Sequence, residues 1–583
     1  MTTPITVLRA LVGCLLALPL LAAHAELPRP AHGLIVKLKD APAHELAQSA
    51  AGAARAQSEQ GRMRRVLAEA GVAADLGEAR MRPSGRSAQL LRFARPLAAE
   101  EAQALAQRLR QRADVEWVVP NEREHRLALT TPNDPMFAAT ASSDGQWWLR
   151  PAGGSNANAI KDRMRGVPAI QSAWSINPGS ASAVVAVLDT GITAHPDLNG
   201  GQLLPGYDFV SEVDYANDGG GRDADPSDPG DWVTSSEKAS NPLFKDCDVT
   251  DSNWHGTIIS GLIAAATNNG DGVAGINWSG RVLPVRVAGK CGATVSDIVD
   301  GMRWAGGLSV AGVADNPNPA RVINISFGSS AACNAAYQSA IDELYAVGVV
   351  VVAAAGNEHT AVIRPASCNH VVAVAALNRD GFKASYSNFG PDVVVSTVGG
   401  DDSSGAWGDL LTDGGLLTLY NLGTTGPGAA GYARVFGTSF AAPVVAGTIS
   451  LMLSVNANLT VDQIVAGLRL SARPHVTSTV IGQCSASNPG RCICTSTTCG
   501  AGILDAPQAL AYAHNPTGYA PPTPTVTNID APEVVAAAAR GPDIAQGSTN
   551  SSDSGGGGAL DGWALLALAA LTLLALLALR RRA

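Results

Sequence analysis

Short apolar runs alternate with helix-like stretches through the middle of the chain, and this alternation constrains the fold more than any other feature. The runs are continuously apolar and rich in valine and isoleucine. Strands that are apolar on both faces and alternate with helices predict an α/β fold, in which helices cover both faces of a parallel sheet. The runs span residues 184–188, 282–287, 322–325, 349–353, 371–375 and 393–395, and the helix-like stretches 258–266, 297–305 and 335–346.

Three motifs bring reactive side chains to the carboxyl ends of such strands, where parallel sheets bind ligands. VLDTG places Asp189 just after a predicted strand, HGTIISG places His255 at the start of a helix, and GTSFAAP does the same for Ser439. Each residue alone is more simply explained as the cap of a turn or helix. Together they supply a hydroxyl nucleophile, a base that titrates near neutral pH and a carboxylate to orient that base.

In this order, the three motifs resemble those of the subtilisin-type serine endopeptidases, over about residues 132–511. The resemblance implies hydrolysis of peptide bonds in proteins and peptides through an acyl-enzyme, without a catalytic cofactor. It implies that Asp189 orients the base, that His255 acts as general base and then acid, and that Ser439 is the nucleophile. Phe440 stands where the family often has Met, which leaves the side-chain preference of the pocket open.

The resemblance also implies roles for two further segments. Asn357, in AAAGNE, is expected to donate to the oxyanion, although a Gly-Asn pair can also be a simple turn. The segment after the predicted strand 322–325 resembles the family's extended strand that pairs with substrate backbone, although it could be an ordinary strand end. The predicted substrate-binding residues are Ser326, Phe327, Gly328, Ala355 and Gly356.

An acidic loop at residues 210–231 holds seven carboxylates and one arginine. Ca²⁺ binds six to eight hard oxygen ligands, so this density predicts either a structural calcium site or a solvated loop. The family resemblance favours calcium. The predicted ligands are Asp218, Asp223, Asp225 and Asp228.

Eight of the nine cysteines lie beyond the first 25 residues, and an even number in an exported protein predicts disulfides. The spacing leaves the pairing open, although Cys492 and Cys494 are too close to pair comfortably with each other. A zinc cluster of the last four is the weaker alternative, since no C-x-x-C pair is present. The cysteines are Cys247, Cys291, Cys333, Cys368, Cys484, Cys492, Cys494 and Cys499.

The two ends of the chain carry targeting signals. Residues 1–25 combine Arg9, an apolar run and the pattern Ala-His-Ala, which predicts a signal peptide and export. A Pro-, Thr-, Ser- and Gly-rich linker is expected at 516–558, and a transmembrane helix closed by three arginines at 559–583. This tail resembles bacterial Gly-Gly sorting signals, which implies sorting machinery, an intramembrane protease that cleaves the tail, and temporary anchoring in the inner membrane of a secreted or cell-envelope protein.

Residues 26–130 are expected to form a small α+β module ahead of a peptidase domain at 131–515. The module carries 17 basic and 13 acidic side chains, whereas residues 131–579 carry 20 and 37. By resemblance it is the inhibitory propeptide of a zymogen, removed by self-cleavage near 125–132, and the opposite net charges are compatible with its docking.

Other classes of function are less consistent with the sequence. The net charge of −9 argues against a nucleic-acid partner. A binding protein on a degenerate protease fold should lack a reacting group, and none of Asp189, His255, Ser439 and Asn357 is missing. A dinucleotide-binding enzyme should carry G-x-G-x-x-G after the strand at 184–188, and that motif is absent there.

Overall fold

The computed structural model describes residues 31–39, 52–71, 80–84, 88–121, 130–140, 143–153 and 164–543. They fall into two units, divided between Leu127 and Ala128. The predicted signal peptide at 1–25 and the predicted transmembrane tail at 559–583 lie outside the described residues.

The first unit is an antiparallel sheet with two helices, and its strand order is β2-β3-β1-β4. Leu34 and Leu91 of the sheet and Met63 and Leu109 of the helices are fully buried in one core. Arginines interrupt the apolar pattern of the strands at residues 80–84 and 88–97, so the sequence does not mark these two segments as strands. The elements are β1 (Ala31–Leu38), α2 (Gly52–Glu69), β2 (Arg80–Ser84), β3 (Ala88–Leu97), α4 (Ala99–Arg110) and β4 (Val115–Pro120).

The second unit is built on a parallel sheet of seven strands in the order β11-β10-β9-β8-β5-β7-β6. All six predicted strands are confirmed, most with ends shifted by one to three residues. The seventh, β6, has only two residues, too few to give a sequence pattern. The strands are β5 (Val184–Asp189), β6 (Tyr207–Asp208), β7 (Arg281–Arg286), β8 (Val322–Ile325), β9 (Val350–Ala354), β10 (Val371–Leu377) and β11 (Val393–Val398).

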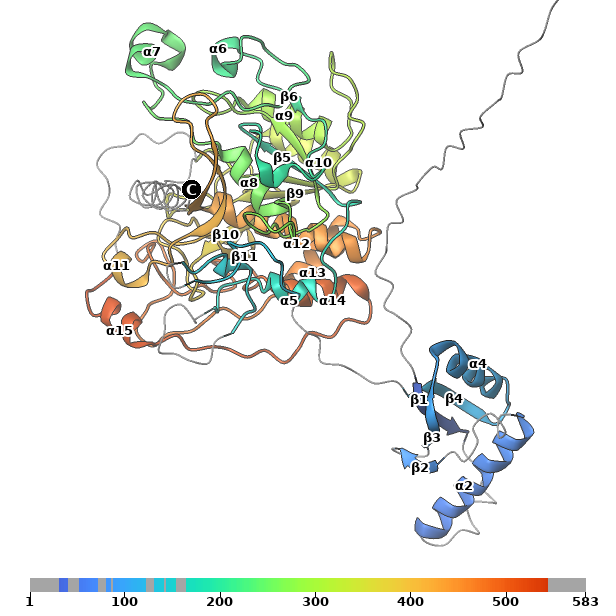
Figure 1. Ribbon diagram of the computed structural model, residues 1–583. Coiled ribbons are helices and arrows are strands. Elements are labelled where there is room, and N and C mark those ends of the chain that lie inside the picture. The colour runs from blue at the N-terminus through green and yellow to red at the C-terminus, as the bar shows by residue number, and fades with distance from the viewer. Residues whose placement is uncertain are drawn as a thin grey trace, which may run out of the picture. The chain divides into compact units, whose positions relative to one another are not determined.

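Helices cover both faces of this sheet, as predicted (Figure 1). Val185 and Val187 of β5 face a core shared with α5, α8, α12, α13 and α14, whereas Ala186 and Leu188 face the core of α9 and α10. Burial on both faces explains why the strands are continuously apolar. The helices are α5 (Ile170–Trp174), α8 (His255–Ala264), α9 (Val295–Ala305), α10 (Ala335–Ala346), α12 (Thr438–Val455), α13 (Val461–Ser471) and α14 (Ala506–His514).

Helix α12 is the one described helix that is long and apolar enough to cross a membrane, but 89% of its apolar window is buried inside the protein. It contacts β8, β9, β10 and the neighbouring helices α8 and α14. Its apolar character therefore follows from its place in the centre of the core.

Shorter elements surround the sheet. A two-stranded antiparallel hairpin, β12 (Leu416–Asn421) and β13 (Ala430–Val435), packs on α8. The hairpin was not predicted, because its strands lie in a Gly- and Thr-rich stretch of the sequence. The remaining elements are η1 (Trp147–Leu149), η3 (Pro196–Leu198), α6 (Val213–Ala216), α7 (Ser235–Ser240), η4 (Pro242–Phe244), α11 (Gly408–Leu411) and α15 (Pro532–Ala538).

Part of the segment expected to be a linker is folded onto the second unit instead. Residues 526–543 include α15, which buries Val534 and Ala537 against α11 and the disulfide-rich region. Asp543 is 2% exposed and accepts hydrogen bonds from Arg491 Nη1, at 3.0 Å, and from the Trp407 amide, at 3.1 Å. We call residues 526–543 the C-terminal strap. Its longest apolar run, residues 534–539, consists of two valines and four alanines and follows the Pro- and Thr-rich stretch of the expected linker.

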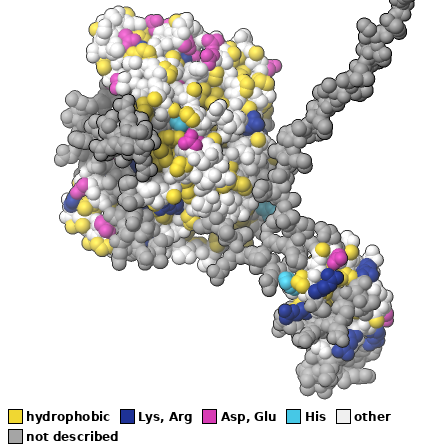
Figure 2. Space-filling view, viewed as in Figure 1, with side chains coloured by type: hydrophobic (Ala, Val, Ile, Leu, Met, Phe, Trp, Pro, Cys, Tyr) yellow, Lys and Arg dark blue, Asp and Glu magenta, His cyan; other side chains and the backbone are white. Residues whose placement is uncertain are grey.

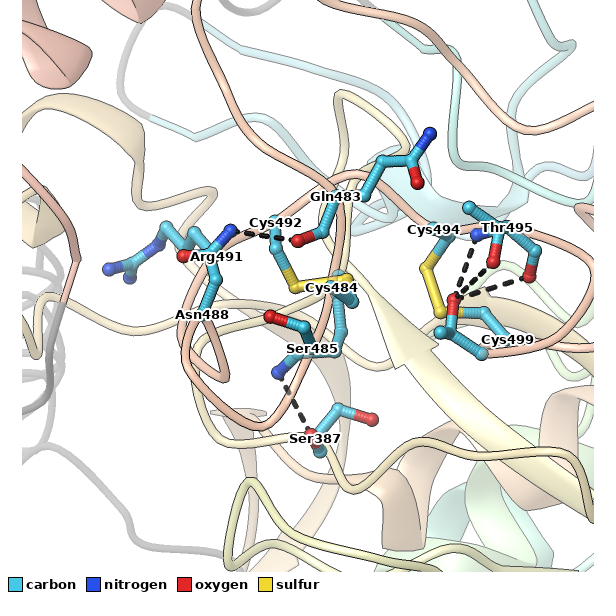
Figure 3. The surroundings of a disulfide bond; sticks show 12 residues. Ser387, Gln483, Cys484, Ser485, Asn488, Arg491, Cys492, Cys494, Thr495 and Cys499 are labelled. Atoms are coloured by element: carbon cyan, nitrogen blue, oxygen red, sulfur yellow. Dashed lines mark hydrogen bonds between the residues drawn. A yellow bond between two sulfur atoms is a disulfide. The ribbon is translucent and has the colours of Figure 1, made fainter.

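The eight cysteines form four disulfides, as predicted: Cys247–Cys291, Cys333–Cys368, Cys484–Cys492 and Cys494–Cys499. Figure 3 shows the last two side by side. In the part of the chain that the structure describes, Cys484, Cys494 and Cys499 are the one group of three His, Cys, Asp or Glu residues whose ligand atoms lie within 4.8 Å of one another. Each of these sulfurs is bonded to another sulfur, so none is the thiolate that zinc requires.

The charge asymmetry of the sequence is visible on the surface. In Figure 2, Lys and Arg side chains gather on the first unit, whereas Asp and Glu side chains gather at the end of the second unit that carries α6 and α7. Helix α6 lies within the acidic loop, residues 210–231, and α7 follows it in the chain.

Candidate active site

Asp189, His255 and Ser439 come from three elements of the second unit. Asp189 is the last residue of β5, His255 is the first residue of α8, and Ser439 is the second residue of α12. All three are buried, with exposed fractions of 1%, 4% and 2%.

The Asp189 carboxylate and the His255 imidazole form a direct pair. His255 Nδ1 lies 2.9 Å from both carboxylate oxygens of Asp189, so the carboxylate holds the tautomer in which Nδ1 carries the hydrogen. Within the described residues, His255 Nε2 has no hydrogen-bond partner. That nitrogen is therefore available to take a proton from a nucleophile or a water.

Close packing of α8 against the end of β5 brings these two side chains together. A Cβ atom at Gly256 would lie 2.1 Å from the Gly191 carbonyl oxygen, so glycine is required where the helix begins. The hydroxyl of Thr190 accepts a hydrogen bond from the Gly256 amide, at 3.1 Å, and the Thr190 amide donates to Asp189 Oδ1, at 2.8 Å. Thr190 thus fixes both partners, a role that its place after Asp189 in VLDTG does not by itself indicate.

The Ser439 hydroxyl donates to the carbonyl oxygen of Ser326, at 2.8 Å, while the Ser326 hydroxyl donates to the Ser439 carbonyl oxygen, at 2.7 Å. These reciprocal bonds attach the start of α12 to the chain just beyond β8. The ring of Phe440 lies 5.5 Å, between centroids, from the ring of His255, so α12 also contacts the imidazole.

Asn357, which follows β9, is held by the residue before the serine. Its Oδ1 accepts hydrogen bonds from the amide and the hydroxyl of Thr438, both at 2.9 Å. Because the amide oxygen is occupied in this way, Asn357 Nδ2 remains as a donor. Thr438 was not assigned from the sequence, although its place beside Ser439 in GTSFAAP could have suggested it.

The predicted substrate-binding residues lie beside this constellation. Ser326, Phe327 and Gly328 leave the carboxyl end of β8, and the next residue, Ser329, pairs with Arg364 in an isolated antiparallel bridge. Ala355 and Gly356 are buried between β9 and Asn357, and the Gly356 amide donates to the Thr438 hydroxyl, at 3.1 Å. The two predicted segments thus both contact the start of α12.

Comparison with known proteins identifies the family. A family model described as the Subtilase family matches residues 180–498. The chain belongs to the subtilase family. An extracellular protease of Xanthomonas campestris pv. campestris is 39% identical over 454 residues, which cover 78% of this chain and 68% of the relative.

Other subtilases agree with this assignment. An extracellular basic protease of Dichelobacter nodosus is 37% identical, with 61% of this chain and 53% of the relative covered, and thermitase of Thermoactinomyces vulgaris is 30% identical, with 56% and 86% covered. A solved protease structure from Pseudoalteromonas arctica is 41% identical with a TM-score of 0.53, and the match covers 66% of this chain and all of that one. The subtilase described here is a serine-type endopeptidase.

The electrostatics of this subtilase favour protonation of His255. Burial disfavours the charged imidazolium, but the charge and hydrogen bond of Asp189, with the charges of Asp231 and Asp228, outweigh burial and raise the pKa of His255 above its ordinary value. A histidine with a raised pKa accepts a proton more readily, because the imidazolium that forms is stabilised.

The four aspartates predicted to bind calcium are not brought together as one set of ligands. Asp218 contacts Arg286 Nη1, at 2.9 Å, and Asp228 accepts from the Thr190 hydroxyl, at 2.6 Å. Asp223 and Asp225 are exposed and accept from amides two residues further along the chain. Among the described carboxylates, no three oxygens from different residues lie within 4.8 Å of one another. The four carboxylates therefore do not form one ligand set, and calcium binding by the acidic loop stays a prediction.

Proposed function

We propose that this subtilase is an exported endopeptidase that hydrolyses peptide bonds of proteins with Asp189, His255 and Ser439 as its catalytic triad. The observation that carries the proposal is the buried pair of His255 Nδ1 with Asp189, which leaves Nε2 as a base next to α12. Export is supported by relatives named extracellular proteases.

The reaction begins when Ser439 Oγ attacks the carbonyl carbon of the scissile peptide bond and His255 Nε2 takes the hydroxyl proton. A tetrahedral intermediate forms, and it collapses as the imidazolium gives its proton to the departing amine. The ester left on Ser439 is then hydrolysed by a water that His255 deprotonates. Asp189 keeps Nδ1 protonated throughout and stabilises the transient imidazolium.

Asn357 Nδ2 and the Ser439 amide are proposed to donate to the oxyanion of the tetrahedral intermediate. The Ser439 amide is at the first turn of α12, where backbone N–H groups lack partners within the helix and the helix dipole favours negative charge. Thr438 keeps the Asn357 carboxamide in one orientation before substrate arrives, which reduces the reorganisation needed during the reaction.

Substrates are proposed to bind as an extended strand along residues 326–328. The carbonyl oxygen of Ser326 is an acceptor beside the proposed nucleophile, because the Ser439 hydroxyl donates to it. Recognition through main-chain hydrogen bonds tolerates varied side chains and suits unfolded or loop segments of proteins. Ala355 and Gly356 are proposed to form the wall of the pocket for the substrate side chain.

The mature enzyme is proposed to arise by cleavage at both ends of the chain. Residues 26–130 would act as an inhibitory propeptide that the enzyme itself removes, and the C-terminal tail would be cleaved by an intramembrane protease during sorting. Because the C-terminal strap is folded onto the second unit as far as Asp543, we expect tail cleavage after residue 543.

The substitution Ser439→Ala tests the proposal. We expect it to abolish hydrolysis of a protein substrate, labelling by a fluorophosphonate probe and removal of residues 26–130. The matched control is Ser454→Ala, at a serine near the far end of α12 whose hydroxyl donates only to a carbonyl within the helix. Hydrolysis that persists in Ser439→Ala would overturn the assignment of the nucleophile.

A further inference from the structure

Asp231, the last residue of the acidic loop, is hydrogen-bonded to the segment that leads into the base. Its Oδ1 accepts from the amide of Asn253, at 3.0 Å, and its Oδ2 accepts from the Asn253 side-chain Nδ2, at 2.7 Å. Both carboxylate oxygens thus hold one residue, and they fix its backbone and its carboxamide together.

Asn253 transmits this constraint to His255. Its Oδ1 accepts from the His255 amide, at 2.9 Å, while its Nδ2 is taken by Asp231. Trp254, between them, has a left-handed backbone with a φ of +57° and makes no side-chain hydrogen bond to the start of α8. The Asn253 carboxamide therefore accepts the hydrogen bond of the first amide of the helix. This bond fixes the backbone of His255, from which the imidazole extends.

The position of Asp231 is fixed by contacts that do not involve His255. The Asp231 amide donates to the Ser252 hydroxyl, at 3.1 Å, and this hydroxyl donates to the Thr425 carbonyl oxygen, at 2.6 Å. Trp254 Nε1 donates to the Gly423 carbonyl oxygen, at 2.7 Å. The acidic loop, the segment before α8 and the loop between β12 and β13 are therefore joined at one place.

Three carboxyl groups lie within electrostatic reach of the imidazole: Asp189 at the end of β5, and Asp228 and Asp231 in the acidic loop. Asp228 is buried, and burial raises its pKa to about 7 despite the Thr190 hydrogen bond, so near neutral pH its charge is only partial. Asp231 is half-buried; burial also raises its pKa, against the donors of Asn253. Above that pKa, Asp231 adds a second full negative charge near the base.

We propose that Asp231 is a positioning residue for the general base: it holds Asn253, which fixes the His255 backbone, and its charge favours the imidazolium. This inference rests on the proposed function, since it takes His255 as the base. It assigns to the acidic loop a part in the reaction that needs no bound cation.

The test compares Asp231→Asn with Asp246→Asn, which removes the same charge from an exposed side chain of the same unit. The measurement is kcat/KM against pH with a chromogenic peptide, alongside the melting temperature of each variant. For Asp231→Asn we expect the acid limb of the kcat/KM profile to move to lower pH by roughly half a unit or more, because a negative charge near His255 is lost. We also expect the plateau of kcat/KM to fall about tenfold, because the His255 backbone is no longer held in position. The Asp246→Asn profile should superimpose on the wild type.

Two further variants separate charge from position. Asp231→Glu keeps the charge and should restore the acid limb. Asn253→Ala keeps Asp231 but removes the acceptor of the His255 amide, so the plateau should fall while the acid limb stays in place. If Asp231→Asn gives the wild-type profile, the inference is overturned. If Asp231→Asn does not fold, a wild-type profile for Asn253→Ala overturns it instead. Such a result would leave the proposed function intact, since the latter depends on the loss of activity in Ser439→Ala.

Discussion

The Ser439 hydroxyl donates to the Ser326 carbonyl oxygen, at 2.8 Å, and His255 Nε2 is left without a partner among the described residues. The proposed substrate strand includes Ser326, so the N–H of a bound peptide would compete for the same oxygen. We expect peptide binding to displace the hydroxyl, which a rotation about one side-chain torsion then brings toward His255.

A crystal structure with a non-cleavable peptide analogue tests this rotation. In the complex, the peptide should donate to the Ser326 oxygen, and Ser439 Oγ should lie within hydrogen-bond distance of His255 Nε2. A productively bound peptide with Ser439 still on Ser326 would contradict the prediction.

Asn357→Ala should lower kcat by about 10²–10³ with little change in KM, because an oxyanion donor acts on charge that develops only in the transition state. The measurement is steady-state hydrolysis of a peptide substrate. Asn458→Ala, at an exposed asparagine after α12, is the control and should leave kcat unchanged. Equal effects of Asn357→Ala on kcat and on substrate binding would argue for a merely structural role.

Thr438→Val should lower kcat about three- to tenfold, because it removes the hydroxyl that donates to Asn357 Oδ1, a bond of about 1 kcal/mol. Thr438→Ser keeps the hydroxyl and should restore most of the activity. The same steady-state assay separates the two variants. If Thr438→Ser were as impaired as Thr438→Val, the methyl group rather than the hydrogen bond would be responsible.

The wild-type enzyme should lose kcat/KM as the pH falls through a value above 6.5, the ordinary pKa of histidine. Activity falls toward acid pH because the protonated imidazole, which predominates below the pKa of His255, cannot accept the serine proton. The carboxylates around His255 raise that pKa, so the fall begins at a higher pH. A pH profile of kcat/KM in the free enzyme measures the limb directly. An acid limb clearly below 6.5 would show that burial outweighs the carboxylates.

Asp543→Ala should destabilise the second unit by about 3 kcal/mol, because it leaves Arg491, which is fully buried, with one carboxylate fewer. Urea unfolding of the inactive Ser439→Ala protein measures this without self-digestion. Asp246→Ala, at an exposed aspartate, should change the unfolding free energy little. If Asp543→Ala had no effect, the strap would not contribute to stability.

Much of the fold was determined by the sequence alone, because burial leaves a local signature. A strand covered on both faces must be continuously apolar, and all six strands with this signature are present in the parallel sheet. The motifs around Asp189, His255 and Ser439 are equally local, so the sequence was sufficient to place them at strand and helix ends.

What the tertiary structure decided depends on contacts between segments far apart in the chain. The packing of loops decides the disulfide pairs, the ion pair of Arg491 with Asp543 and the separation of the four predicted calcium ligands. No local spacing in the sequence encodes this packing. The same is true of Asp231: its carboxylate is one of seven in an acidic loop, and only folding brings it to Asn253 and so to His255. Local patterns report burial, whereas hydrogen-bond partners are chosen by three-dimensional proximity.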